Sequence, residues 1–549
     1  MYCLLECPQI AVACFATFLL TIPVAQAKPS SARVARQVDN VLAVALFDES
    51  TSLAPRCDDA TYIRRVWLDT VGDIPPPETV LEFVIDPSAK KRKRDVRKLL
   101  QNPHYGKNWA RYWRDVIFYR RIEDRALLAS PAMVADLTQR FNNNVGWDKI
   151  ATEFMTATGD VRNNGGTAIL MAQAAMTEQT TAEVARIFLG LQIGCAQCHD
   201  HPYDRWKREQ FHELAAFFPR VGVRPVRTDT KRSFEIYANN SPKNRRAKAK
   251  GRPQREHFMP DLENPKAPGT RMQPKFFLTG ASLPLGTSDA ERRQQLARWF
   301  TENRWFATAM VNRMWSELVG EGFYESVEDI GPERQAKAPT AIRLLSNQFR
   351  ASGYDLKWLI ETICQTNAYQ RESRPRRDPK DIPFTANVPQ RLRADQLFTA
   401  LVSVLEIDEK NLPPRRRKPS QAGLVDTRKS ARPAFNRLFG YDPSVAREDV
   451  AISIPQTLAL MNGLQVNRVI RGTGKNTMLG RLLADVAGEE ALIEELYLRC
   501  LSREPTSSER SLAFAYRNEI VRDTNYARRM AYEDLLWALI NSTEFQYRK

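Results

Sequence analysis

The most informative stretch of the chain is FLGLQIGCAQCHDHPYDRW, residues 188–206. It contains two of the eight cysteines and two of the five histidines in the 549-residue sequence. Cys195, Cys198 and His199 form a C-x-x-C-H signature within it. Side chains of these types bind metals and attach haem, which makes this stretch the candidate functional site.

Helical patterns flank this stretch on both sides. Residues 180–191 begin with a Thr-x-x-Glu capping box and continue with apolar side chains at three- and four-residue spacing. Asp204 can cap a second helix, which carries Phe211 on its apolar face. Similar periodicity predicts helices elsewhere, for example over 58–72 and 488–502. The sequence therefore predicts a mainly α fold in which the C-x-x-C-H segment is a turn between two packed helices.

The length of the chain indicates two or more domains. We predict an N-terminal helical domain over 38–221, a linker over 222–284 and a C-terminal helical domain over 285–549. The linker is basic and rich in proline and asparagine, with β-like pieces at 233–237 and 275–278 and a mobile centre near 240–268.

The N-terminus has the pattern of an export signal. Residues 10–24 are almost all apolar, too few for a membrane span, and Ala25-Gln-Ala27 is a small-x-small cleavage site. The segment before the apolar run carries Glu6 and no basic residue, unlike a typical signal peptide. An uncleaved membrane anchor or a misassigned start site is therefore the alternative. We predict a signal peptide over 1–27, a periplasmic or secreted location, and no transmembrane segment after the signal.

The formal net charge of +17 raises the question of nucleic-acid binding. Much of the excess lies in short basic runs such as 243–252 and 415–418, within proline- or asparagine-rich surroundings. Such runs are typical of solvated loops, and no nucleic-acid-binding motif accompanies them. We therefore predict no nucleic-acid partner.

The C-x-x-C-H signature is the pattern of covalent haem c attachment. Cys195 and Cys198 would form the two thioethers, and His199 would be the axial ligand of the iron. Thioether formation needs reduced thiols on a translocated chain, which agrees with an export signal. The first hypothesis is an exported c-type haem protein with an electron-transfer or haem redox role. Its redox partner, sixth iron ligand and oligomeric state are not specified by the sequence.

Three other interpretations use the same residues. The two motif cysteines with His201 and His212 have the composition of a zinc site, in a non-redox envelope protein that binds a partner or polymer. His199, Asp200 and His201 could instead be ligands of a metal-dependent hydrolase, which leaves enzymatic activity open. The cysteines could also form a redox disulfide, although no thioredoxin-like βαβ pattern surrounds them. His257 has no partner at ligand spacing and is expected to be a surface or capping residue.

The sequence resembles the large planctomycete family of secreted, cytochrome c-associated two-domain proteins. Besides the C-x-x-C-H stretch, the resemblance rests on seven segments: 62–75, 155–159, 306–322, 352–358, 390–396, 453–456 and 498–505. The resemblance implies two consecutive domains of unknown function. Family members often carry a separate cytochrome c domain, which would precede residue 38, where this sequence has no room for one. Any haem is therefore expected on Cys195, Cys198 and His199.

Overall fold

The computed structural model describes residues 28–227, 232–240, 255–376, 378, 380–409, 431–445, 450, 452–463, 469–473, 476–520 and 525–549. The predicted signal peptide, the basic runs 243–252 and 415–418, and much of the predicted mobile centre of the linker lie outside these residues. Helices dominate the described chain and its strands are short, so the prediction of a mainly α fold is confirmed. No helix of the described residues is long and apolar enough to cross a membrane.

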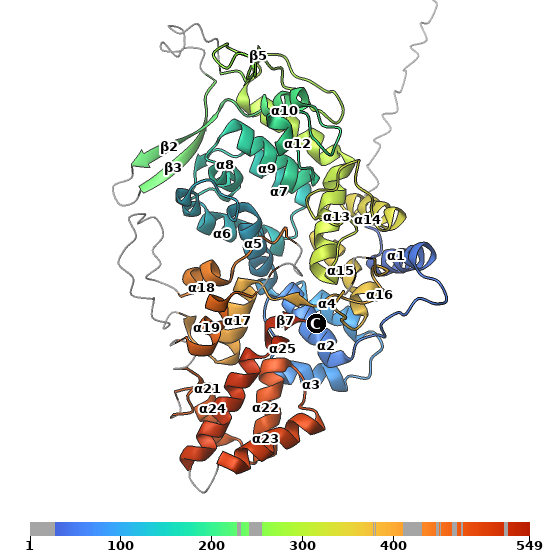
Figure 1. Ribbon diagram of the computed structural model, residues 1–549, viewed down its shortest axis with the longest axis vertical. Coiled ribbons are helices and arrows are strands. Elements are labelled where there is room, and N and C mark those ends of the chain that lie inside the picture. The colour runs from blue at the N-terminus through green and yellow to red at the C-terminus, as the bar shows by residue number, and fades with distance from the viewer. Residues whose placement is uncertain are drawn as a thin grey trace, which may run out of the picture.

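The N-terminal part of the chain is a succession of short amphipathic helices (Figure 1). The second of them illustrates how local sequence sets a boundary. Asp58 accepts a hydrogen bond from the backbone N–H of Thr61, as an N-cap residue does. The helices of this part are α1 (Ser31–Leu46), α2 (Asp59–Thr70), α3 (Pro77–Ile85), α4 (Lys91–Leu99), α5 (Pro103–Phe118), η1 (Asp124–Leu128), α6 (Ser130–Asn142), α7 (Trp147–Thr156), η2 (Gly165–Thr167), α8 (Ala168–Ala172), α9 (Thr177–Leu189), η3 (Gly194–Gln197) and α10 (Arg208–Ala215).

Short antiparallel strands occupy the described part of the predicted linker. β2 (Val221–Arg227) and β3 (Arg232–Ala238) form a hairpin that also pairs with β1 (Gly159–Asp160), in the order β1-β3-β2. β4 (Phe258–Met259) pairs with β5 (Thr270–Arg271). The β-like piece predicted at 233–237 lies in β3, whereas 275–278 takes part in only an isolated bridge between Lys275 and Ser282.

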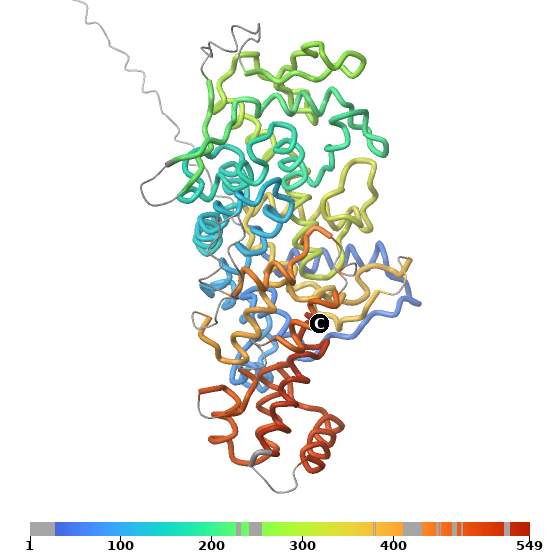
Figure 2. Tube along the Cα trace, turned by 60° about the vertical axis from the view of Figure 1, so that its left-hand side comes forward, coloured from blue at the N-terminus to red at the C-terminus, as the bar shows by residue number. Residues whose placement is uncertain are grey.

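The C-terminal part is again helical. Its helices are α12 (Asp289–Glu302), α13 (Arg304–Val319), α14 (Pro339–Ala351), α15 (Leu356–Cys364), α16 (Asn367–Gln370), α17 (Ala394–Val404), α18 (Arg432–Phe439), α19 (Ile454–Asn462), α21 (Met478–Asp485), α22 (Glu489–Leu501), α23 (Ser507–Ile520), α24 (Asn525–Asn541) and α25 (Thr543–Gln546). The strand β7 (Tyr547–Arg548) then returns to pair with β6 (Gln390–Arg391). Helices α21 to α24 form one end of the elongated molecule (Figures 1 and 2).

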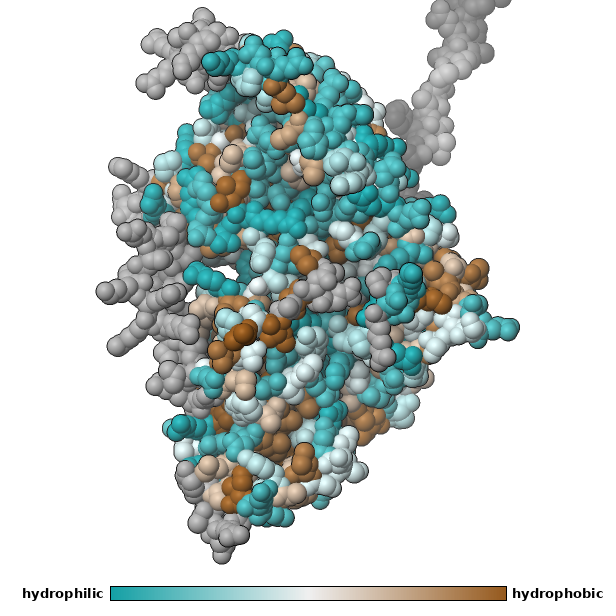
Figure 3. Space-filling view, viewed as in Figure 1, coloured by the Kyte–Doolittle hydropathy of each residue, from teal (hydrophilic) through white to brown (hydrophobic). Residues whose placement is uncertain are grey.

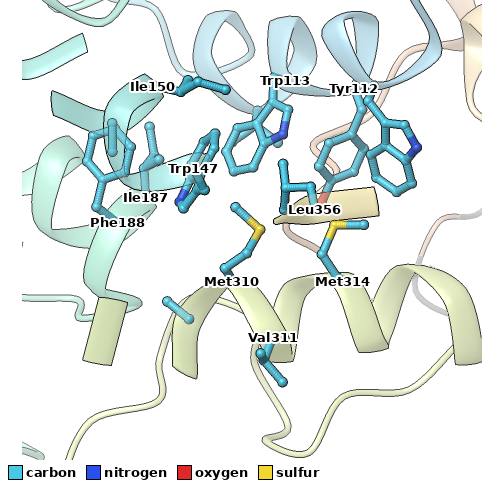
Figure 4. Close-up of a cluster of buried hydrophobic side chains, with 14 of the residues drawn as sticks. Tyr112, Trp113, Trp147, Ile150, Ile187, Phe188, Met310, Val311, Met314 and Leu356 are labelled. Atoms are coloured by element: carbon cyan, nitrogen blue, oxygen red, sulfur yellow. The ribbon is translucent and has the colours of Figure 1, made fainter. Parts of the chain in front are cut away.

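One large apolar core joins the two predicted helical domains. Trp113 of α5 stacks on Trp147 of α7 with ring centroids 4.4 Å apart, and both side chains are fully buried. Met310 of α13 points toward these rings from the C-terminal part, and Met314 of the same helix points toward Tyr112 (Figure 4). A second apolar core lies mainly among α17, α21, α22 and α24. On the face seen in Figure 3, hydrophilic residues dominate the upper half, and apolar residues are more frequent below.

Candidate functional site

The C-x-x-C-H segment is a turn between α9 and α10, as predicted. Helix α9 ends where Gly190 adopts a left-handed conformation, with φ of 65°. The chain then enters the short helix η3, which contains Cys195, and Cys198 follows as its C-cap. Because both thiols are free and exposed, they are open to reagents from solvent.

Both predicted helix starts beside this turn are wrong. Helix α9 begins at Thr177 rather than Thr180, so Glu183 lies inside the helix, where its carboxylate pairs with Arg186. Helix α10 begins at Arg208 and is not capped by Asp204. The backbone N–H of Arg208 instead donates to the carboxylate of Asp200 over 2.9 Å. The contact with Asp200, eight residues before Arg208, leaves no signal in the local spacing of capping residues.

His199 is held with one ring nitrogen occupied. Its Nδ1 lies 2.7 Å from the carbonyl oxygen of Asp200, and a carbonyl oxygen can only accept. Nδ1 therefore carries the proton and donates, which leaves the lone pair on Nε2. Metal-binding histidines are commonly fixed by such a hydrogen bond from the second ring nitrogen to a backbone carbonyl. The side chain of His199 is exposed, so Nε2 is accessible.

Asp200 closes the turn rather than facing an open site. One carboxylate oxygen lies 2.8 Å from Nζ of Lys207, and the other accepts from the N–H of Arg208. The hydrogen bond from Lys207, followed by that from Arg208, lowers the pKa of the Asp200 carboxyl. The Nδ1 of His201 accepts from the backbone N–H of Tyr203 over 3.2 Å. Two of the three ligands considered for a metal-dependent hydrolase, Asp200 and His201, are therefore engaged in hydrogen bonds within the turn.

The structure places His212 in a buried pair with His257. The Nε2 of His212 lies 3.0 Å from the carbonyl oxygen of Gln197, so it is this nitrogen that donates. Its Nδ1 accepts from Nε2 of His257 over 2.8 Å. The rings are nearly parallel, with an interplanar angle of 20° and centroids 5.1 Å apart. Of the two expectations for His257, a surface or a capping residue, the first is wrong, because its side chain is almost completely buried.

Burial disfavours the protonated form of both histidines. It lowers the pKa of His212, and burial together with the neighbouring His212 lowers the pKa of His257 to about 4. Both ring nitrogens of His212 have hydrogen-bond partners. In this arrangement His212 therefore has no ring nitrogen free to bind a zinc ion together with Cys195, Cys198 and His201. Across the residues that the structure describes, no group of three or more Cys, His, Asp or Glu side chains is placed to hold a metal ion.

Segments distant in sequence hold the motif turn in place. The backbone N–H of Ile330, in the loop after α13, donates to the carbonyl of Gly190 over 2.9 Å. Arg334 from the same loop donates to the carbonyl of Tyr203 over 3.2 Å. Arg208 donates to the carbonyl of Pro260, next to β4, over 2.5 Å. The linker and the C-terminal part of the chain therefore support a site whose chemical groups all come from the N-terminal part.

A buried ionic network lies behind this turn. The carboxylate of Glu328 contacts Arg186 of α9, Arg313 of α13 and Arg120 after α5, and its side chain is 1% exposed. Burial opposes the ionisation of Glu328, but the charges of Arg186, Arg313 and Arg120 outweigh it and lower the pKa to about 2. The network ties the helix that leads into the motif to the C-terminal part of the chain.

Two segments of the chain match models of known protein families. Residues 37–222 match a family model named PSCyt2, described as a protein of unknown function (DUF1549). Residues 292–516 match a second model named PSD1, also described as a protein of unknown function (DUF1553). The two matches follow each other in the order of the two-domain family type that the motifs of the chain resemble. No curated protein and no solved structure matches the chain.

Proposed function

We propose that this protein attaches haem covalently through Cys195 and Cys198, with His199 as the axial iron ligand, and acts in electron transfer or haem redox chemistry. The observation that carries the proposal is the arrangement of the turn. Two free, exposed thiols precede an exposed imidazole whose Nδ1 donates to a backbone carbonyl. These residues fit the group, since haem c attachment uses two cysteines and a neighbouring histidine in this order.

The residues of the turn have distinct tasks in this proposal. Cys195 and Cys198 would each form a thioether with one vinyl group of the haem, in which a sulfur–carbon bond forms and the thiol proton goes to the other vinyl carbon. The carbonyl of Asp200 orients His199 by accepting from Nδ1. The bound haem would supply one-electron chemistry. Since attachment takes place on exported chains, a periplasmic or secreted location is part of the proposal.

A structural zinc site has less support. A metal binds through one ring nitrogen, so His212 would have to give up its hydrogen bond with Gln197 or with His257 in a buried environment. The buried polar group left unpaired would cost about 1–3 kcal/mol. A hydrolase built on Asp200 would likewise need to break the bonds that close the turn.

The test is the spectrum of protein purified from a host with haem-maturation machinery. We expect a Soret band that survives acid extraction and is lost in Cys195→Ala/Cys198→Ala. His199→Ala should keep covalent haem but shift the bands, because only the axial ligand changes. The matched control is His201→Ala, which should leave the spectrum unchanged. A colourless protein with stoichiometric zinc would contradict the proposal.

A further inference from the structure

A cavity of about 580 Å³ lies between the loop that follows α1 and the loop that follows α16. The two loops run side by side (Figure 2) and are joined by backbone hydrogen bonds from Ala54 to Thr385 and from Glu372 to Pro55, of 2.9 and 2.8 Å. The first loop falls in the segment that matches PSCyt2, and the second falls in the segment that matches PSD1. Binding sites for small molecules occur preferentially at domain boundaries and have volumes of this order.

The less exposed of the two acidic residues in the cavity wall already has its partners. The carboxylate of Glu321, whose side chain is 9% exposed, accepts from the backbone N–H of Phe384 over 2.6 Å and from Lys337 over 3.1 Å, and it also pairs with Arg376. Arg376 in turn donates to the carbonyl of Asp381 over 2.8 Å. The negative charge of Glu321 is therefore balanced by Lys337 and Arg376, and it does not oppose the entry of an anion.

Two cations line the cavity without such compensation. Arg374 and Lys380 both line it and both are exposed, and among the residues that the structure describes neither side chain has an ionic partner. Asp381 is the acid that lines the cavity on the same loop, and its carboxylate accepts from the backbone N–H of Asp378 over 3.1 Å. The positive charges of Arg374 and Lys380 are therefore available to an anion.

The remaining lining is suited to the body of a small molecule. Ile382, Ala386 and Val388 supply apolar wall, and Ser52 supplies a hydroxyl. A few polar groups that converge on an apolar wall are typical of a small-molecule site, in which the polar groups orient the ligand. Nothing in this lining comes from the C-x-x-C-H turn, so the cavity is independent of the proposed haem site.

We propose that this cavity binds a small organic anion, with its acidic group between Arg374 and Lys380 and its body against Ile382 and Ala386. A carboxylate, a phosphate ester and a sulfate ester share the chemistry that these two cations recognise. The cavity volume suits a ligand of about the size of a substituted monosaccharide. A guanidinium and an ammonium group favour an anion over a neutral molecule of the same shape, and added salt should weaken the interaction.

The experiment is calorimetric titration of the full chain with glucuronate, glucose 6-phosphate, inorganic phosphate and neutral glucose. We expect glucuronate or glucose 6-phosphate to bind, more weakly as salt is raised, and glucose not to bind. Inorganic phosphate separates the contribution of the acidic group from that of the body. The proposal would be overturned if glucose bound as tightly as glucuronate. It would also be overturned if neither glucuronate nor glucose 6-phosphate bound.

Variants locate the binding. Arg374→Gln and Lys380→Gln should each weaken binding about fivefold to tenfold, as expected for one charge-assisted contact at an exposed site. The matched control is Arg343→Gln, an exposed arginine of α14 outside the cavity lining, which should bind as the wild type does. If the two cavity variants together melt below the wild type, Ile382→Trp replaces them, since the larger side chain narrows the cavity. Unchanged affinity in the folded variants would refute the assignment.

Discussion

Glu328→Gln should destabilise the protein by about 3–5 kcal/mol, the range for breaking a buried ion pair from one side. The wild-type carboxylate has Arg313 at 2.7 Å and Arg120 at 3.2 Å, and it contacts Arg186 as well. Glutamine keeps the volume of the side chain but removes the charge. The guanidinium groups of Arg186 and Arg313 are buried. In the variant they lose the carboxylate whose negative charge offsets the cost of removing them from water.

The pH dependence gives an independent measure of the same contribution. The pKa of Glu328 falls from its ordinary value of 4.5 to about 2 in the folded protein. At 1.36 kcal/mol per unit, this shift corresponds to about 3 kcal/mol of stability. Because the folded-state pKa is the lower one, that stability is fully present above about pH 4.5 and is lost as the pH falls toward 2. Both routes therefore give a loss of about 3 kcal/mol or more.

Urea unfolding at neutral pH and at several acidic pH values is the assay. The variant should unfold at lower urea than the wild type at neutral pH, and its stability should change less between pH 4.5 and 2. Glu325→Gln is the matched control, since this residue lies in the same loop and is exposed. We expect it to change the free energy of unfolding by less than about 0.5 kcal/mol. Equal losses in the two variants would refute the reasoning.

Three further changes test the packing around the motif. Gly190→Ala should lower the free energy of unfolding by about 1–3 kcal/mol. The reason is that φ at this position is 65° and the new Cβ would lie 2.7 Å from Cγ1 of Ile330. Trp113→Ala should cost about 3–5 kcal/mol by the same measurement, since a fully buried indole leaves a cavity. His212→Phe should speed amide hydrogen exchange in the turn around Gln197, whose carbonyl loses its donor, but not in α22. Unchanged unfolding in either of the first two variants, or unchanged exchange in the third, would contradict the corresponding argument.

Much of the secondary structure follows from local pattern. The helix predicted over 58–72 corresponds to α2, Asp59–Thr70, with Asp58 as its cap, and that predicted over 488–502 corresponds to α22, Glu489–Leu501. Helical periodicity and N-caps depend on contacts between residues three or four positions apart, which the sequence contains in full. The same reasoning predicted a turn at Cys195 to His199 between two packed helices, and the structure adds that the turn is exposed.

Tertiary structure decided the surroundings of that turn. His212 and His257 are separated by 45 positions and form a hydrogen-bonded pair, which no local pattern indicates. Glu328 finds Arg186, 142 positions away, and the helix before the motif begins at Thr177 instead of at the capping box. The sequence alone determined the helices and the chemical groups of the site, because these depend on neighbours along the chain. Which buried polar groups satisfy one another depends on how distant segments pack, and only the folded chain determines that.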